Sequence, residues 1–185
     1  AVALPNAGNI GGGGFMLVNE AASGQSVALD FRETAPASAQ RSMYLDAQGQ
    51  VIDGKSLYTH HAVGVPGTVA GLTHALQQWG TLPLAHVLQP AIDLAEQGYP
   101  VSTTLAQALE RTQTTMGRWP ATQAIFWKNG APLRAGERLV QKDLAHSLRL
   151  IAQNGAKAFY EGEIAQKIAA EMARHGSPMT LHDLR

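Results

Sequence analysis

The spacing of apolar residues changes once along the 185-residue chain, and this change limits the folds open to it. Near the start, Phe15–Val18 is an uninterrupted apolar run of strand length, and residues 26–33 alternate between apolar and polar. Residues 19–25 between them are typical of a hairpin connection. From about residue 67 onward the apolar residues fall at helical spacing. One strand pair is too few for a doubly wound sheet, so the sequence predicts an α+β fold, a short strand hairpin followed by a mainly helical region.

About five helices are predicted in that second region, from apolar spacing and from residues that start and stop helices. Thr68 and Ser102 are candidate N-caps. Pro90 lies inside the second helix and should kink it or split it. A capping box at Thr180–Asp183 predicts that a further helix begins there. The predicted helices cover residues 67–79, 83–97, 102–116, 144–154 and 164–175, each of the last two ending before a glycine, with a short hairpin around 125–133.

Charge and cysteine content exclude several classes of function. Fourteen basic and 14 acidic residues give zero formal charge, so no basic field attracts nucleic acid or an anionic membrane surface. No apolar run approaches the roughly 18 residues of a membrane-spanning helix. Cysteine is absent, which excludes disulfides, thiolate metal sites and a cysteine nucleophile. The sequence therefore predicts neither a nucleic-acid nor a membrane partner. Charged residues are only 15% of the chain, which is typical of a protein that buries much of its surface.

The glycine tract Gly11–Gly14 does not have the context of a phosphate-binding loop. Such loops follow a strand and precede a helix, and a P-loop adds a lysine and a Ser or Thr. Here the glycines precede a strand, and no matching motif follows. The tract is better explained by backbone that needs a positive φ or a close approach to another segment.

The seven histidines show no metal-binding spacing. His60 and His61 are adjacent and would point to opposite sides of a strand. No HExxH motif or other compact ligand pair occurs, so the sequence predicts histidines without metal. No GxSxG elbow is present to anchor a Ser-His-Asp triad. Asp143, Asp183 and the glutamates of the late helices are expected on solvated faces.

Arg32 is the strongest candidate for a binding residue. It lies in the segment Asp30–Pro36, at the predicted end of the second strand. A guanidinium in this position could bind a substrate carboxylate through two parallel hydrogen bonds. The alternative is an ion pair with Asp30 or Glu33, and spacing alone does not separate the two.

Three segments together resemble one known family. Gly8–Met16, Asp30–Pro36 and Gly64–Gly71 are similar to motifs of the large subunit of γ-glutamyltranspeptidase (glutathione hydrolase), in the same order and at approximately the same spacing. Weaker similarity continues through residues 90–95, 124–126 and 158–160, so that the resemblance covers essentially the whole chain.

The resemblance implies an N-terminal-nucleophile hydrolase with a layered αββα sandwich, made as one zymogen that cuts itself into a large and a small subunit. The new N-terminal threonine of the small subunit would attack the γ-glutamyl carbonyl, with its own amine as base. The γ-glutamyl group would then pass to water or to an amino acid or peptide. By the same resemblance, Arg32 would bind the substrate's α-carboxylate, no cofactor would be needed, and the protein would be periplasmic or secreted.

The resemblance also predicts what residues 1–185 represent. They are expected to be a single-domain fragment of the large subunit, truncated at both ends and without the threonine nucleophile, so that no catalytic residue lies within the chain. The isolated chain would then be inactive without its small subunit. Two alternatives remain open: a related cephalosporin or glutaryl acylase on the same scaffold, and a non-catalytic structural piece.

Overall fold

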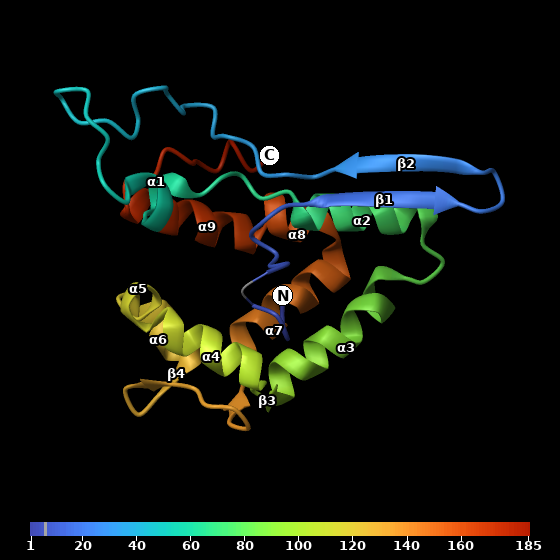
Figure 1. Cartoon of the computed structure of the whole chain (residues 1–185). Helices are drawn as coiled ribbons and strands as arrows, with labels where there is room; N and C mark the ends of the chain where they lie inside the picture. Colours follow the sequence, from blue (N-terminus) through green and yellow to red (C-terminus); the bar gives the residue numbers. More distant parts are fainter. Residues whose placement is uncertain (6) are drawn as a thin grey trace. The chain divides into compact units, whose positions relative to one another are not determined.

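The predicted strand hairpin is present in the computed structural model, which describes residues 1–5 and 7–185. Strands β1 (Phe15–Glu20) and β2 (Gln25–Asp30) pair antiparallel, from Phe15 opposite Asp30 to Glu20 opposite Gln25 (Figure 1). Burial alternates along β1, where Met16 and Val18 are partly buried and Phe15 and Leu17 are exposed. The hairpin therefore has one covered face and one open face.

Contacts among the described residues divide the chain into two compact units. The first, here called the hairpin unit, comprises residues 8–84 and 154–185, and the second, the helical unit, comprises residues 1–7 and 85–153. A division by contacts does not show whether either unit folds alone, so the single-domain assignment stays a prediction.

In the hairpin unit, helix α2 runs along the covered face of the hairpin (Figure 1). The indole Nε1 of Trp79 at the end of α2 donates a 2.8 Å hydrogen bond to Glu20 Oε1 on β1. Ala165, Met179 and Leu184 form a buried cluster in the C-terminal part of this unit. Its helices are α1 (Lys55–Tyr58), the 3-10 helix η1 (His60–Ala62), α2 (Thr68–Trp79), α8 (Ala156–Tyr160) and α9 (Glu163–Arg174).

The helical unit is built around a buried apolar cluster at α4. Its members are Val101, Leu105, Leu109, Leu133 and Leu139. Short antiparallel strand pairs, β3 with β6 and β4 with β5, connect the helices. The elements of this unit are α3 (Leu84–Gln97), β3 (Tyr99–Pro100), α4 (Thr103–Arg111), α5 (Gln113–Met116), α6 (Pro120–Phe126), β4 (Trp127–Lys128), β5 (Ala131–Pro132), β6 (Arg138–Leu139) and α7 (Lys142–Asn154).

Most predicted helix boundaries are confirmed. The Ser102 hydroxyl accepts a 3.1 Å hydrogen bond from Leu105 N and so caps α4. Gly155 and Gly176, just after α7 and α9, both have φ +65, the left-handed conformation that ends helices. The hairpin of β4 and β5 is also present, and its turn at Asn129 and Gly130 has positive φ at both positions.

Other local predictions are wrong in whole or in part. Pro90 does not split α3, because its exposed position lets water reach the helix carbonyl that the missing N–H would have paired, and the alternative of a kink stays a prediction. Thr68 is the first residue of α2, and Gly67 occupies the cap position without a side-chain bond. The predicted helix over 102–116 is two helices, separated at Thr112. Residues 181–184 form a turn where a helix was expected, and α8 was not predicted.

Candidate substrate site

Backbone hydrogen bonds join the three motif segments side by side in the hairpin unit. Gly14 and Phe31 exchange hydrogen bonds of 3.3 and 3.0 Å, which extends the β1–β2 pairing beyond the strands. Thr34 and Val65 exchange two more, of 3.3 and 2.8 Å. The carbonyl of Gly12 accepts from the amides of Gly67 and Thr68 at 2.9 and 3.0 Å. The segment that carries Arg32 is therefore held between the glycine tract and the start of α2.

Glycine is required in these segments because the backbones approach too closely for a side chain. A Cβ on Gly13 would lie 2.6 Å from the carbonyl oxygen of Phe31, and one on Gly67 would lie 2.1 Å from the same oxygen. A Cβ on Gly71 of α2 would lie 2.2 Å from Phe31 Cγ. Close approach thus explains Gly13 and, less strictly, Gly12 and Gly14, whereas the alternative of positive φ is wrong for Gly11–Gly14.

Arg32 lies two residues after the end of β2, on the side of the open face of the hairpin. Its side chain is 62% exposed, and its guanidinium lies 5.7 Å from the ring centroid of Phe15. Its Nε is 3.2 Å from Glu33 Oε2, so the ion pair with Glu33 that the sequence left open is present. Asp30 accepts a 2.9 Å hydrogen bond from the Arg32 backbone amide, not from its guanidinium.

A cavity of about 370 Å³ opens beside Arg32, entirely within the hairpin unit. The Tyr44 hydroxyl donates a 3.0 Å hydrogen bond to the His61 carbonyl and joins two sides of the wall. A cationic side chain at the rim of such a cavity can hold an anionic group by charge and by paired N–H donors. The residues that line it include Arg32, Thr34, Pro36, Met43, Tyr44 and Gly64.

Asp183 fixes the chain just beyond the Arg32 segment, a role that sequence reasoning missed. Its carboxylate accepts 2.7 Å hydrogen bonds from the backbone amides of Ala37 and Thr180 and from the Thr180 hydroxyl. The hydrogen bond from the Ala37 amide is the main cause that lowers the pKa of Asp183 below its ordinary value, and the hydrogen bonds from Thr180 lower it further. The bond from the Thr180 amide is one half of the predicted capping box. Asp183 is partly exposed, in agreement with its predicted place on a solvated face, and it has this structural role in addition.

The histidines also differ from the sequence prediction. His60 and His61 lie in a 3-10 helix, so they do not alternate across a strand. Within the described residues, His60 meets Glu171 and His175 of the same unit in a group with the spacing of a metal site.

Comparison with solved structures shows the class of protein to which this arrangement belongs. The crystal structure of Helicobacter pylori γ-glutamyltranspeptidase matches with a TM-score of 0.96 and 42% identity, over 99% of this chain and 52% of that one. Such neighbours are N-terminal-nucleophile hydrolases, and the α+β order of hairpin and helices found here is part of that fold.

The family is shown by sequence. The family model described as γ-glutamyltranspeptidase matches residues 1–185, and the chain belongs to this family. The glutathione hydrolase proenzyme of Escherichia coli (strain K12) is 49% identical over all of this chain and 32% of its own length. The acylase ACY 1 proenzyme of Pseudomonas sp. (strain V22) is 38% identical over 99% of the chain and 34% of its own length. The chain thus spans about a third of the curated relatives that it matches.

In the described part of the chain, every helix is too short or too polar to cross a membrane.

Proposed function

We propose that the protein containing this chain is a γ-glutamyltransferase and hydrolase that acts on glutathione and related γ-glutamyl compounds. The observation that carries this proposal is the exposed Arg32 at the rim of a cavity, in a segment that two glycine-containing segments hold in place, in a member of this family. The names of the relatives, among them glutathione hydrolase proenzymes from several bacteria, support the same substrate class.

Arg32 binds the α-carboxylate of the γ-glutamyl group in this proposal. Glu33 contacts Nε, and no other ion pair to Arg32 occurs among the described residues, so the two Nη groups can face a carboxylate in a fork. The Glu33 carboxylate also fixes the direction of the guanidinium. The Arg32 side chain therefore loses less conformational entropy when substrate binds.

The covalent chemistry is assigned to the small subunit of the same precursor. Its N-terminal threonine hydroxyl attacks the γ-carbonyl, and the threonine amine takes the hydroxyl proton and returns it to the leaving amine. Water or an acceptor amine then breaks the resulting ester and regenerates the threonine. No cofactor takes part in this sequence of steps.

The open face of the hairpin is the surface that we assign to this small subunit. Phe15 is 66% exposed and Leu17 is 84% exposed, and both share that face with Arg32. Adjacent large apolar side chains on an open sheet face are typical of a surface that a partner covers. Burial there would complete the sandwich and place the threonine near the bound carboxylate.

A periplasmic or secreted location completes the proposal and is supported by the family resemblance alone. Fractionation of cells that express the complete protein tests it, with activity in the periplasm or medium as the expected result.

The acylase relatives favour a second candidate function, that of a cephalosporin acylase. By the family resemblance, such an enzyme would remove glutaryl side chains. A glutaryl group keeps a carboxylate at the same distance from the scissile carbonyl as the γ-glutamyl group and lacks only the α-amino group, so Arg32 could bind either and the two substrates are separated by recognition of that amine. The complete protein should be assayed with γ-glutamyl and glutaryl anilides, with the isolated 185-residue chain beside it. We expect cleavage of the γ-glutamyl anilide by the complete protein only. Preference for the glutaryl anilide would transfer the assignment to the acylase, and silence with both would refute each.

A further inference from the structure

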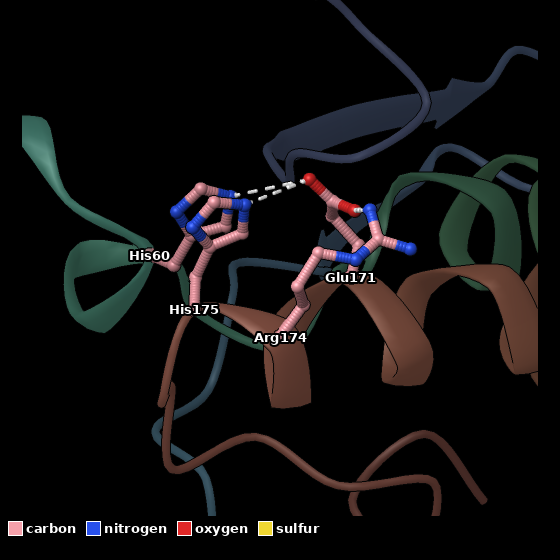
Figure 2. Close-up of polar contacts among 4 residues, drawn as sticks. All are labelled: His60, Glu171, Arg174 and His175. Carbon is pink, nitrogen blue, oxygen red and sulfur yellow. Dashed lines mark hydrogen bonds and ion pairs between the residues drawn. The ribbon is translucent and has the colours of Figure 1, made fainter.

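His60, Glu171 and His175 gather at one point of the hairpin unit although His60 is far from the other two in sequence. His60 begins η1, whereas Glu171 and His175 lie at the C-terminal end of α9 (Figure 2). Glu171 and His175 are four residues apart, a spacing that places two side chains on the same helix face. One ligand atom from each residue lies within 4.8 Å of the other two.

From this geometry we propose that His60, Glu171 and His175 bind a divalent transition-metal ion, with Zn²⁺ as the expected occupant. Two imidazoles and one carboxylate are a ligand set used by zinc sites, which leave the fourth position of the tetrahedron to water. Imidazole nitrogen also favours zinc over calcium and magnesium, which prefer oxygen ligands.

Two of the three distances between ligand atoms need only small changes to fit the ion, and the third, between the two imidazole nitrogens, is no more than 4.8 Å. Metal–ligand bonds of about 2.0–2.2 Å place two ligands of a tetrahedral zinc site about 3.3–3.6 Å apart. His175 Nε2 is 3.1 Å from Glu171 Oε1, and His60 Nε2 is 3.9 Å from the same oxygen. Both contacts are therefore within several tenths of an ångström of the required spacing.

The two rings must turn relative to each other when the metal binds. They are stacked with centroids 3.9 Å apart and an angle of 5° between planes, whereas a metal ion lies in the plane of each imidazole that binds it. Rotation about the Cβ–Cγ bond satisfies this requirement at low cost, because that torsion is broad in histidine.

Arg174 orients the carboxylate without occupying its ligand oxygen. Its guanidinium pairs with Glu171 Oε2, while Oε1 faces the two imidazoles, as Figure 2 shows. Outer contacts of this kind commonly hold a metal ligand in its binding direction. His175 and Glu171 are partly open to solvent, so that the ion and its water ligand can enter.

The ion would fix η1 to α9, close to the wall of the Arg32 cavity, to which the next residue, His61, contributes.

The test is calorimetric titration of ZnCl₂ into the complete protein after treatment with a chelator. Three variants, His60→Ala, His175→Ala and Glu171→Gln, are compared with His86→Ala, which changes an exposed histidine of α3 that lies outside the cluster. Circular dichroism identifies any variant that fails to fold, and Glu171→Gln keeps the side-chain volume of the natural residue.

We expect the natural protein to bind one zinc ion per chain, and the His86→Ala control to bind it equally well. Its affinity should fall by about 10- to 100-fold or more in each cluster variant that folds. Zinc should also raise the thermal midpoint of the natural protein and of His86→Ala, but not of the cluster variants. No zinc binding by the natural protein, or binding that the cluster variants leave unchanged, would overturn the proposal and leave these residues as an ordinary hydrogen-bonded group.

Discussion

Replacement of Asp183 by asparagine is expected to lower the stability of the protein by about 1–2 kcal/mol. Asp183 accepts three hydrogen bonds of 2.7 Å, from the Ala37 amide, the Thr180 amide and the Thr180 hydroxyl. The first of these joins positions 146 residues apart and fixes the chain directly after the Arg32–Pro36 segment. An asparagine has nearly the same shape but only one acceptor oxygen and no charge.

The magnitude follows from what asparagine can keep. A hydrogen bond to a charged group contributes about 1.5–3 kcal/mol net, and one between neutral groups about 0.5–1.5 kcal/mol. Asparagine retains an acceptor on one side, for Ala37 or for Thr180, and turns an N–H donor toward the other. Because water reaches this carboxylate and weakens its hydrogen bonds, we expect a loss of stability at the lower end of this range, about 1–2 kcal/mol.

The loss should depend on pH in a definite direction. The folded protein lowers the pKa of Asp183, so its stabilising effect is complete above the ordinary value of 3.8 and is lost as the pH falls below it toward the folded pKa. The difference in stability between the natural protein and Asp183→Asn should therefore be constant near neutral pH and shrink in strong acid.

Thermal unfolding of the complete protein, followed by circular dichroism between pH 3 and pH 7, measures this difference. Asp53→Asn is the matched control, because it removes an exposed carboxylate from the same unit. A loss of midpoint temperature at pH 7 equal to that of the control would refute the reasoning, and so would a difference that grows in acid.

Two further substitutions test the contacts that hold the Arg32 segment. Gly71→Ala should destabilise the protein by about 1–3 kcal/mol in urea unfolding, because the new Cβ meets Phe31. This loss is expected despite the better helix propensity of alanine. A simultaneous Phe31→Leu change should recover part of it. Equal losses in the single and double variants would contradict a clash with Phe31. Tyr160→Phe should cost about 0.5–1.5 kcal/mol in the same assay, since the hydroxyl donates to the Pro66 carbonyl at 2.8 Å and accepts from the Ala70 amide at 3.2 Å. An unchanged unfolding midpoint would show that this hydroxyl does not fix the start of α2.

Local signals in the sequence predicted local structure well. Ser102 caps α4, and the glycines at 155 and 176 follow the ends of α7 and α9, because caps and left-handed stops depend on a few neighbouring residues. The predicted split at Pro90 does not occur, because tolerance of a proline depends on whether water reaches the freed carbonyl, which periodicity does not encode.

Contacts between distant segments were beyond the same reasoning. Nothing in the spacing of Asp183 indicates that it bonds Ala37, and nothing in the separate positions of His60 and Glu171 indicates that they meet. The glycine tract was correctly predicted to allow close approach, but the segment it approaches, at Phe31, was visible only in the structure. The family resemblance supplied the function that we propose for Arg32, since the residues alone left a carboxylate site and the ion pair with Glu33 equally open.

The role of Arg32 is tested most directly with two anilides that differ only in the α-carboxylate. The complete protein and its Arg32→Ala variant should be assayed with γ-glutamyl anilide and with 4-aminobutyryl anilide, which lacks that carboxylate. If the pair between the Arg32 guanidinium and the substrate α-carboxylate contributes about 2–4 kcal/mol, kcat/KM for the γ-glutamyl anilide falls roughly 30- to 1000-fold in the variant. The value for the 4-aminobutyryl anilide is low in both proteins and hardly changes. Arg111→Ala, an exposed arginine of the helical unit, should leave both values as they are. Equal losses on the two anilides, or no loss on either, would contradict the assignment of Arg32 as the residue that binds the substrate carboxylate.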